Sequence, residues 1–169
     1  MKQRVSWVGL FLLVALLAGC GYRGQEALPQ DLNRIHVNIT NPSVFRPGLE
    51  AELTQALRQR ILSSGGQVVK DKSLADATIQ GTIAALENNP ISFDARDIAT
   101  RFRTVVVLDL QVVQRNGQVE LAKERVSGEA FYSAPPGITG TEAARNDSIR
   151  RALFDLADKV LARVAEPFF

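Results

Sequence analysis

Two short arginine-containing segments carry the side chains in this chain best suited to binding an anion. Phe93-Asp94-Ala95-Arg96 and Arg101-Phe102-Arg103 lie close together, between two stretches with the pattern of long strands. Guanidinium groups bind phosphate through paired hydrogen bonds, and the neighbouring phenylalanines can contact acyl chains or the wall of a partner. The alternative interpretation is an ordinary surface loop, in which Asp94 and Asp97 pair with the arginines.

Residue types for catalysis or metal binding are sparse. The only histidine is His36 and the only cysteine is Cys20. Neither a thiolate nor a histidine-rich zinc site can be built from one residue of each kind. His36 falls in an alternating stretch, so we interpret it as a polar-face strand residue. No serine-nucleophile motif of the G-x-S-x-G or S-x-x-K type is present. We predict no catalytic residue, no metal and no cofactor.

The cysteine follows a short apolar run. Lys2 and Arg4 precede apolar residues 5–18, and Leu17-Ala18-Gly19-Cys20 ends the run. This is the layout of a secretory signal, and it is shorter than the roughly 20 residues that a membrane-spanning helix needs. The last four residues resemble a bacterial lipobox, in which the cysteine is lipidated and becomes the first residue of the mature protein. The G-x-G-x-x-G pattern at 19–24 lacks the strand and helix of a dinucleotide site.

Charge and length narrow the class of protein further. The chain has 169 residues, with 20 basic and 18 acidic residues. Two of the basic residues, Lys2 and Arg4, lie in the signal, which leaves 18 of each sign. A balanced domain gives no electrostatic reason to expect nucleic-acid binding. We expect a signal peptide over residues 1–19, a lipidated tether over 20–32 and a single domain over 33–169.

Hydrophobic periodicity predicts the elements of this domain. Strands are expected over 34–39, 67–70, 77–86, 101–115 and 118–133. Helices are expected from Pro47 to a stop at Gly65-Gly66 and from about Thr141 to Ala165. Asn88-Asn89-Pro90 is expected to close the third strand, with 91–100 irregular. Asn116-Gly117 predicts a tight hairpin between the last two strands.

These elements predict an α+β fold with two helices packed on one face of a four- to five-stranded mixed, mostly antiparallel sheet. The first strand, helix and strand are expected to form a right-handed crossover between parallel strands. Val105 and Val107, on the other face of their strand, and Phe168-Phe169 are expected to add uncovered apolar surface. Such surface often marks an interface with a partner.

With the elements placed, the mature chain resembles the lipopolysaccharide-assembly lipoprotein family, LptE. The resemblance rests on short pieces in a fixed order: Cys20-Gly21-Tyr22, Leu28-Pro29, Ile35-His36-Val37, Asn41, Phe45, Pro47-Gly48-Leu49-Glu50, Leu53-Thr54-Gln55-Ala56-Leu57, Ala75-Asp76-Ala77 and Ile79-Gln80-Gly81. It implies two helices on a small sheet, in agreement with the predicted fold.

The resemblance also implies an outer-membrane lipoprotein inside the β-barrel translocon LptD. There it would serve as plug and assembly aid and bind lipopolysaccharide during insertion into the outer leaflet. Gly21 after the lipidated cysteine, in place of an aspartate, favours sorting to the outer membrane. The arginines Arg96, Arg101 and Arg103 are our own prediction for the lipopolysaccharide contact, made from their charge.

Two other functions stay open at this point. One is an envelope lipoprotein that scaffolds or activates another periplasmic complex, such as a peptidoglycan synthase or a lipid transporter. The other is a periplasmic hydrolase, because paired carboxylates can cleave glycosides. The candidate pairs are Asp94 with Asp97 and Glu120 with Glu124.

Overall fold

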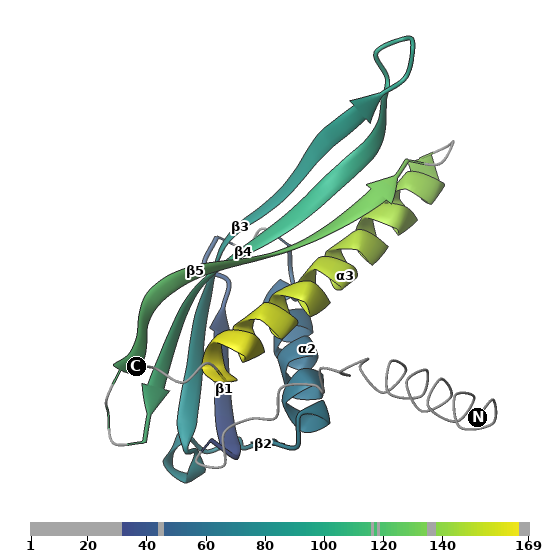
Figure 1. Cartoon of the computed structure of the whole chain (residues 1–169). Coiled ribbons are helices and arrows are strands. Elements are labelled where there is room, and N and C mark those ends of the chain that lie inside the picture. The colour runs from purple at the N-terminus through teal and green to yellow at the C-terminus, as the bar shows by residue number, and fades with distance from the viewer. Residues whose placement is uncertain (1–31, 44–45, 116, 118, 135–137, 166–169) are drawn as a thin grey trace, which may run out of the picture.

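The computed structural model describes residues 32–43, 46–115, 117, 119–134 and 138–165 (Figure 1). The predicted signal, nearly all of the tether, Cys20 and Phe168-Phe169 lie outside these residues. The elements follow in the order β1 (Arg34–Thr40), α2 (Leu49–Ser63), β2 (Gln67–Val68), η1 (Lys72–Leu74, a 3-10 turn), β3 (Ala77–Phe93), β4 (Ala99–Gln114), β5 (Val119–Ser133) and α3 (Ile138–Ala165).

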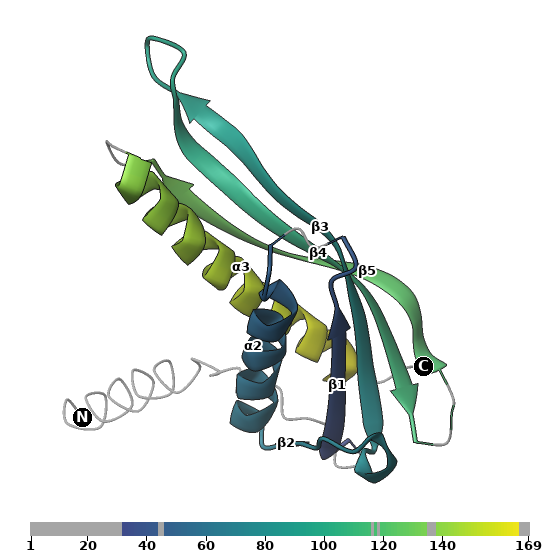
Figure 2. The same cartoon turned by 180° about the vertical axis from the view of Figure 1, so that it is seen from behind.

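The described strands form one sheet in the order β2-β1-β3-β4-β5. Strand β1 runs parallel to β2 and β3, whereas β3 with β4 and β4 with β5 are antiparallel. Both helices lie on the same face of this sheet and leave the other face open (Figures 1 and 2). The predicted α+β class, the mixed sheet and the parallel pairing across the first helix are confirmed.

Helix α2 begins at Leu49, two residues after the predicted start at Pro47, and ends just before the predicted stop at Gly65-Gly66. Gly48 precedes it with φ 81°, and Gly65 follows it with φ 84°, a backbone region that favours glycine. The N–H of Gly66 donates to the carbonyl of Ile61 at 3.0 Å, which closes the last turn. The buried stripe of α2 consists of Leu49, Leu53, Ala56, Leu57 and Ile61.

Strand β3 corrects the predicted boundary. It continues through Pro90 to Phe93 instead of closing at Asn88-Asn89-Pro90. Its last pairing with β1 is at Thr82, so from there onward only β4 pairs with it. A proline lacks a donor and is tolerated on such an edge strand or at a bulge. The register shifts between Pro90 and Ser92 provide the bulge.

The sheet face opposite the helices exposes less of Val105 and Val107 than expected. Val105 is only 8 % exposed, and Val107 is half-buried. Val105 lies between Glu87 on β3 and Glu129 on β5 in the strand register, and side chains directly opposite on one face are close neighbours. The prediction of an uncovered apolar patch at Val105 is therefore wrong.

Helix α3 begins at Ile138, three residues before the predicted start, and packs closely on β5. A Cβ at Gly128 would collide with the backbone carbonyl of Ala152 and with Leu156. Glycine therefore allows the helix and strand to approach. The core between sheet and helices includes Ile35, Leu57, Ile79, Leu108, Leu110 and Leu156, all with 0 % exposure.

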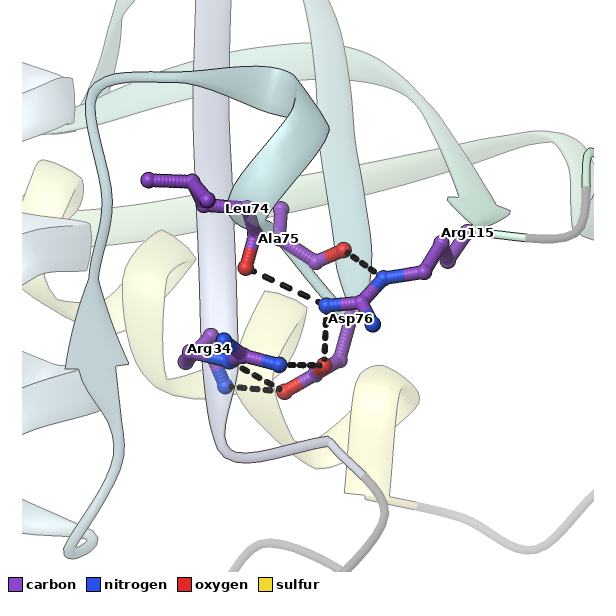
Figure 3. A network of polar contacts seen from close by, with 5 residues as sticks. All are labelled: Arg34, Leu74, Ala75, Asp76 and Arg115. Atoms are coloured by element: carbon purple, nitrogen blue, oxygen red, sulfur yellow. Dashed lines mark hydrogen bonds and ion pairs between the residues drawn. The ribbon is translucent and has the colours of Figure 1, made fainter.

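One carboxylate joins three strand ends at the base of the sheet (Figure 3). Asp76, just before β3, accepts hydrogen bonds from the backbone N–H of Arg34 at 2.8 Å and from its Nη2 at 3.0 Å. Arg115, just after β4, donates from Nη2 to the same carboxylate at 2.9 Å. Arg115 also donates to the carbonyls of Ala75 and Leu74. The hydrogen bonds from Arg34 lower the pKa of Asp76.

Candidate functional site

The predicted arginine loop is the end of a β3–β4 hairpin that projects beyond the helices. Figures 1 and 2 show β3 and β4 extending past the end of β5 and the start of α3. The last residue of β5, Ser133, pairs with Arg101. Residues 91–99 therefore form a two-stranded extension, which we call the hairpin end.

The turn of the hairpin end is built by Asp94. Its Oδ1 accepts hydrogen bonds from the backbone N–H of Arg96 at 2.8 Å and of Ile98 at 2.9 Å. These bonds, that from Ile98 with the larger effect, lower the pKa of the Asp94 carboxyl. Asp97 completes the turn with φ 57°, a region that aspartate tolerates better than most residues. Asp94 is thus a turn-forming residue.

The structure separates Arg96 from the other two predicted arginines. Arg96 lies in the turn, where its Nη2 is 3.3 Å from Asp94 Oδ2 and its side chain is 80 % exposed. The surface-loop interpretation is correct for this pair. Asp97 pairs with no arginine among the described residues, and neither Arg101 nor Arg103 contacts Asp94.

Arg101 and Arg103 do lie together, on the open face of β4, because alternate residues of a strand share a face. The guanidinium carbon of Arg101 is 5.6 Å from the centre of the Phe131 ring, within the range of a cation–π contact. Arg101 has no acidic partner among the described residues, and Arg103 Nε lies 3.7 Å from Glu129 Oε2. Phe131 is 40 % exposed. We call Arg101, Arg103 and Phe131 the arginine face.

The two predicted phenylalanines have different surroundings. Phe102 faces the helix side, where its ring stacks on Tyr132 with ring centres 5.1 Å apart. Phe93 remains 55 % exposed at the hairpin end, as do Ile98 at 55 % and Ile91 at 46 %. The apolar residues available to a ligand or partner are therefore Ile91, Phe93 and Ile98. Phe102 instead holds β4 against β5.

Sequence reasoning did not identify Phe131, Ile91 or Ile98 as part of this site. Phe131 belongs to it through the β4–β5 register, which places it opposite Arg103. Ile91 and Ile98 belong to it because β3 continues past Pro90. The signal available for Ile91 and Ile98 was two exposed apolar residues flanking a polar turn.

The described residues contain no group of three or more histidine, cysteine or acidic residues placed to hold a metal ion. Within the same residues, neither helix has both the length and the apolar character needed to cross a membrane.

Known proteins resemble this chain at the level of family and fold. The family model described as "LptE: Lipopolysaccharide-assembly" matches residues 32–164. Lipoprotein B from Nitrosomonas europaea, an NMR structure, is 18 % identical with a TM-score of 0.59, covering 87 % of this chain and 90 % of that one. The rare lipoprotein B from Shewanella oneidensis is 11 % identical with a TM-score of 0.56, covering 77 % and 93 %.

A third similar structure is a lipoprotein of Caulobacter crescentus, 17 % identical with a TM-score of 0.53, covering 76 % of this chain and 87 % of that one. At these identities the likeness concerns the fold alone. Comparison with curated protein sequences gives no match.

Proposed function

Because this chain belongs to the LptE family of lipopolysaccharide-assembly lipoproteins, we propose that it is a non-catalytic subunit of the translocon that inserts lipopolysaccharide into the outer membrane. In this proposal Cys20 carries the lipid anchor, and the domain lies on the periplasmic side or inside the lumen of an LptD-type β-barrel. It acts there as plug and assembly aid. The observation that carries the proposal is the family match over residues 32–164, which span every described element except the last residue of α3.

The arginine face is the proposed contact for lipopolysaccharide. The lipid part of this ligand combines phosphate groups with acyl chains, so its binding site needs cations beside apolar surface. Arg101 and Arg103 supply two guanidinium forks, and Phe131 keeps the first of them in place. Arginine suits this role because its planar fork binds phosphate bidentately and stacks on aromatic rings.

The hairpin end is the proposed contact for acyl chains or for an apolar partner wall. Ile91, Phe93 and Ile98 expose large apolar surface there, and removal of such surface from water stabilises a complex by roughly 25 cal/mol per Å². Arg96, in the turn, would add a third cation at the far end of the bound ligand.

Of the three arginines, we expect Arg101 to contribute most to lipopolysaccharide binding, because its neighbours differ from those of the other two. Arg96 and Arg103 each have an acidic neighbour, at 3.3 Å and 3.7 Å, which partly neutralises them. Arg101 is oriented by a ring instead of a carboxylate, so its charge is available to a phosphate without an ion pair having to break. An exposed ion pair is itself worth only about 0–1 kcal/mol, so Arg96 and Arg103 can still contribute.

The test is binding of purified lipopolysaccharide to Arg101→Ala, Arg103→Ala and Arg96→Ala variants. We expect the double change at Arg101 and Arg103 to weaken binding by about tenfold or more, as the loss of one charged hydrogen bond costs about 1.5–3 kcal/mol. Arg101→Lys should restore only part of the affinity, because lysine lacks the planar fork.

Arg150→Ala is the matched control, because Arg150 is an exposed arginine that pairs with Asp147 on α3. It should bind like the unaltered protein. Equal affinity of the Arg101/Arg103 variant and this control would reject the arginine face as the contact. Absence of any lipopolysaccharide binding by the unaltered protein would count against the proposed function itself.

A further inference from the structure

The open face of the sheet carries two rows of polar side chains that cross the strands. Asn38 on β1, Gln80 on β3 and Gln111 on β4 are register partners and form an amide row. The core-facing neighbours in these strands, among them Ile79 and Leu110, are fully buried. Since successive side chains of a strand point to opposite faces, the amide row lies on the face without helices.

A second row lies beside the first, one pleat further along. It consists of Thr40, Thr82, Asp109 and Arg125, again as register partners across four strands. The hydroxyls of Thr40 and Thr82 are 3.1 Å apart, and Arg125 Nε donates to Asp109 Oδ1 at 2.9 Å. This second row is therefore held in place by its own contacts.

The two rows line a shallow groove of ≈ 250 Å³. Its lining includes Asn38, Thr40, Gln80, Asp109, Gln111 and Lys123. Lys123 lies on β5, next to the register shift between Leu110 and Val112. We call this depression the amide groove.

The three amides of the groove have no internal partners. None of Asn38, Gln80 and Gln111 makes a side-chain hydrogen bond to another residue of the described structure. Each therefore offers two N–H donors and a carbonyl acceptor to whatever lies above it. Neighbouring strands are about 4.8 Å apart, so these groups recur at short, regular intervals.

This donor and acceptor pattern selects a class of ligand. A sugar hydroxyl both donates and accepts, so it pairs with an amide or a threonine hydroxyl in either direction and donates to a carboxylate. The groove lacks the aromatic platforms and the cluster of cations on which single-stranded nucleic acids bind. Its lining is also too polar for an acyl chain. Lys123 supplies one positive charge for an acidic substituent on the sugar.

We propose that the amide groove binds a polyhydroxylated saccharide, which, on the basis of the proposed function, is the oligosaccharide part of lipopolysaccharide. The arginine face lies on the same face of β4. Asp109 lies six positions after Arg103, which is about 20 Å along a strand. One lipopolysaccharide molecule can then lie along this face, with its phosphates at the arginines and its sugars in the groove.

The experiment uses the water-soluble oligosaccharide that mild acid releases from lipopolysaccharide, titrated into the isotopically labelled protein. We expect chemical-shift changes at the backbone amides around Gln80 and Gln111. The double variant Gln80→Ala with Gln111→Ala should bind at least fivefold more weakly. The matched control is Gln55→Ala, an exposed amide on α2, which should bind normally. If the double variant does not fold, Asn38→Ala on β1 provides the same test.

The outcomes separate this inference from the proposed function. No shift at the groove, or equal binding by the double variant and Gln55→Ala, overturns the saccharide site. If intact lipopolysaccharide still binds through Arg101 and Arg103 in that case, the proposed function stands alone. A peptidoglycan-derived glycan fragment is the second ligand, and preferential binding of that fragment would overturn the assignment to lipopolysaccharide.

Discussion

The hydroxyl of Thr104 on β4 lies 2.6 Å from the hydroxyl of Ser148 on α3, and both residues are buried. Thr104 lies two residues along β4 from Phe102, whose ring stacks on Tyr132. Asn88 donates to the Tyr132 hydroxyl at 2.9 Å. A small polar cluster therefore joins β3, β4, β5 and α3 at the base of the projecting hairpin.

The costs of removing the two members of the Thr104–Ser148 pair should be less than additive. Ser148→Ala or Thr104→Val alone removes the hydrogen bond between the hydroxyls, while the remaining hydroxyl keeps its other contact, to Asn88 Oδ1 for Thr104 or to the Arg145 carbonyl for Ser148. Each single change should cost about 0.5–1.5 kcal/mol, and the second change should add less because the shared bond is already lost. Denaturant unfolding of the two single variants and the double variant measures this difference. Strictly additive free energies of unfolding would contradict the coupling.

Gly128→Ala should be strongly destabilising. The added Cβ meets backbone atoms of α3 at Ala152 and Leu156, so helix and strand must separate. Overpacking of this kind costs about 1–3 kcal/mol or more. Gly81→Ala is the control, because its Cβ would meet only side-chain ends of Ile39 and Leu108. In thermal unfolding, Gly128→Ala should lower the melting temperature more than Gly81→Ala does. A smaller decrease in melting temperature for Gly128→Ala would be inconsistent with this packing.

The outer edge of β5 is closed by three side chains of α3. Arg151 donates to the carbonyl of Phe131 at 3.0 Å, and Lys159 donates to that of Ser127 at 3.1 Å. Between them, Asp155 accepts from the N–H of Glu129 at 2.8 Å. An open edge strand is a template for pairing with another chain, so these contacts protect the protein from self-association.

Alanine at all three α3 positions should therefore promote oligomers at concentrations where the unaltered protein is monomeric. Sedimentation velocity measures this effect directly. The control changes Glu142 and Arg145 to alanine. These two exposed residues also lie on α3, but they form an ion pair with each other. A monomeric triple variant would show that the β5 edge needs no protection.

The Asp76 network predicts a pH-dependent contribution to stability. The hydrogen bonds from Arg34 lower the pKa of Asp76 in the folded state, below the unfolded value of about 3.9. The ionised carboxylate thus favours folding. Its contribution is complete above the unfolded pKa and is lost as the pH falls through the folded pKa.

Asp76→Asn should accordingly be less stable than the unaltered protein at pH 7, by about 1–3 kcal/mol. The difference in free energy of unfolding between the two proteins should shrink as the pH is lowered below about 4, where the Asp76 carboxylate of the unaltered protein becomes protonated. Urea unfolding across this pH range provides the measurement. Glu142→Gln, at an exposed helix pair, controls for the change in net charge. A difference that stays constant with pH would rule out the ionised carboxylate as its source.

Much of this architecture follows from local patterns. The alternation in β1 and the apolar stripes of α2 and α3 place their residues on the core face, where Ile35, Leu57 and Leu156 are fully buried. Gly65, with positive φ, marks the predicted end of α2, whereas the helix starts after Gly48, later than the predicted start at Pro47. The likeness of the ordered sequence pieces to the LptE family is confirmed by the family match.

The parts that escaped prediction depend on pairing between distant segments. Pro90 marks a strand end only when both neighbours of the strand are present, and β1 stops pairing with β3 at Thr82. Phe131 faces Arg103 because irregularities near Val112 shift the register of β4 and β5. A shift of one residue moves every side chain to the other face, so the arginine face could not be assembled from the tight turn alone.

The central claim, that this protein is a lipid-anchored subunit of an outer-membrane translocon, is tested most directly by co-purification from native envelopes. The full chain, with Cys20 intact, is solubilised in mild detergent, purified and compared with Cys20→Ser. We predict a large β-barrel of the LptD type in stoichiometric amount with the unaltered chain and loss of membrane attachment in Cys20→Ser. Recovery of the lipidated chain without any large β-barrel would contradict the account.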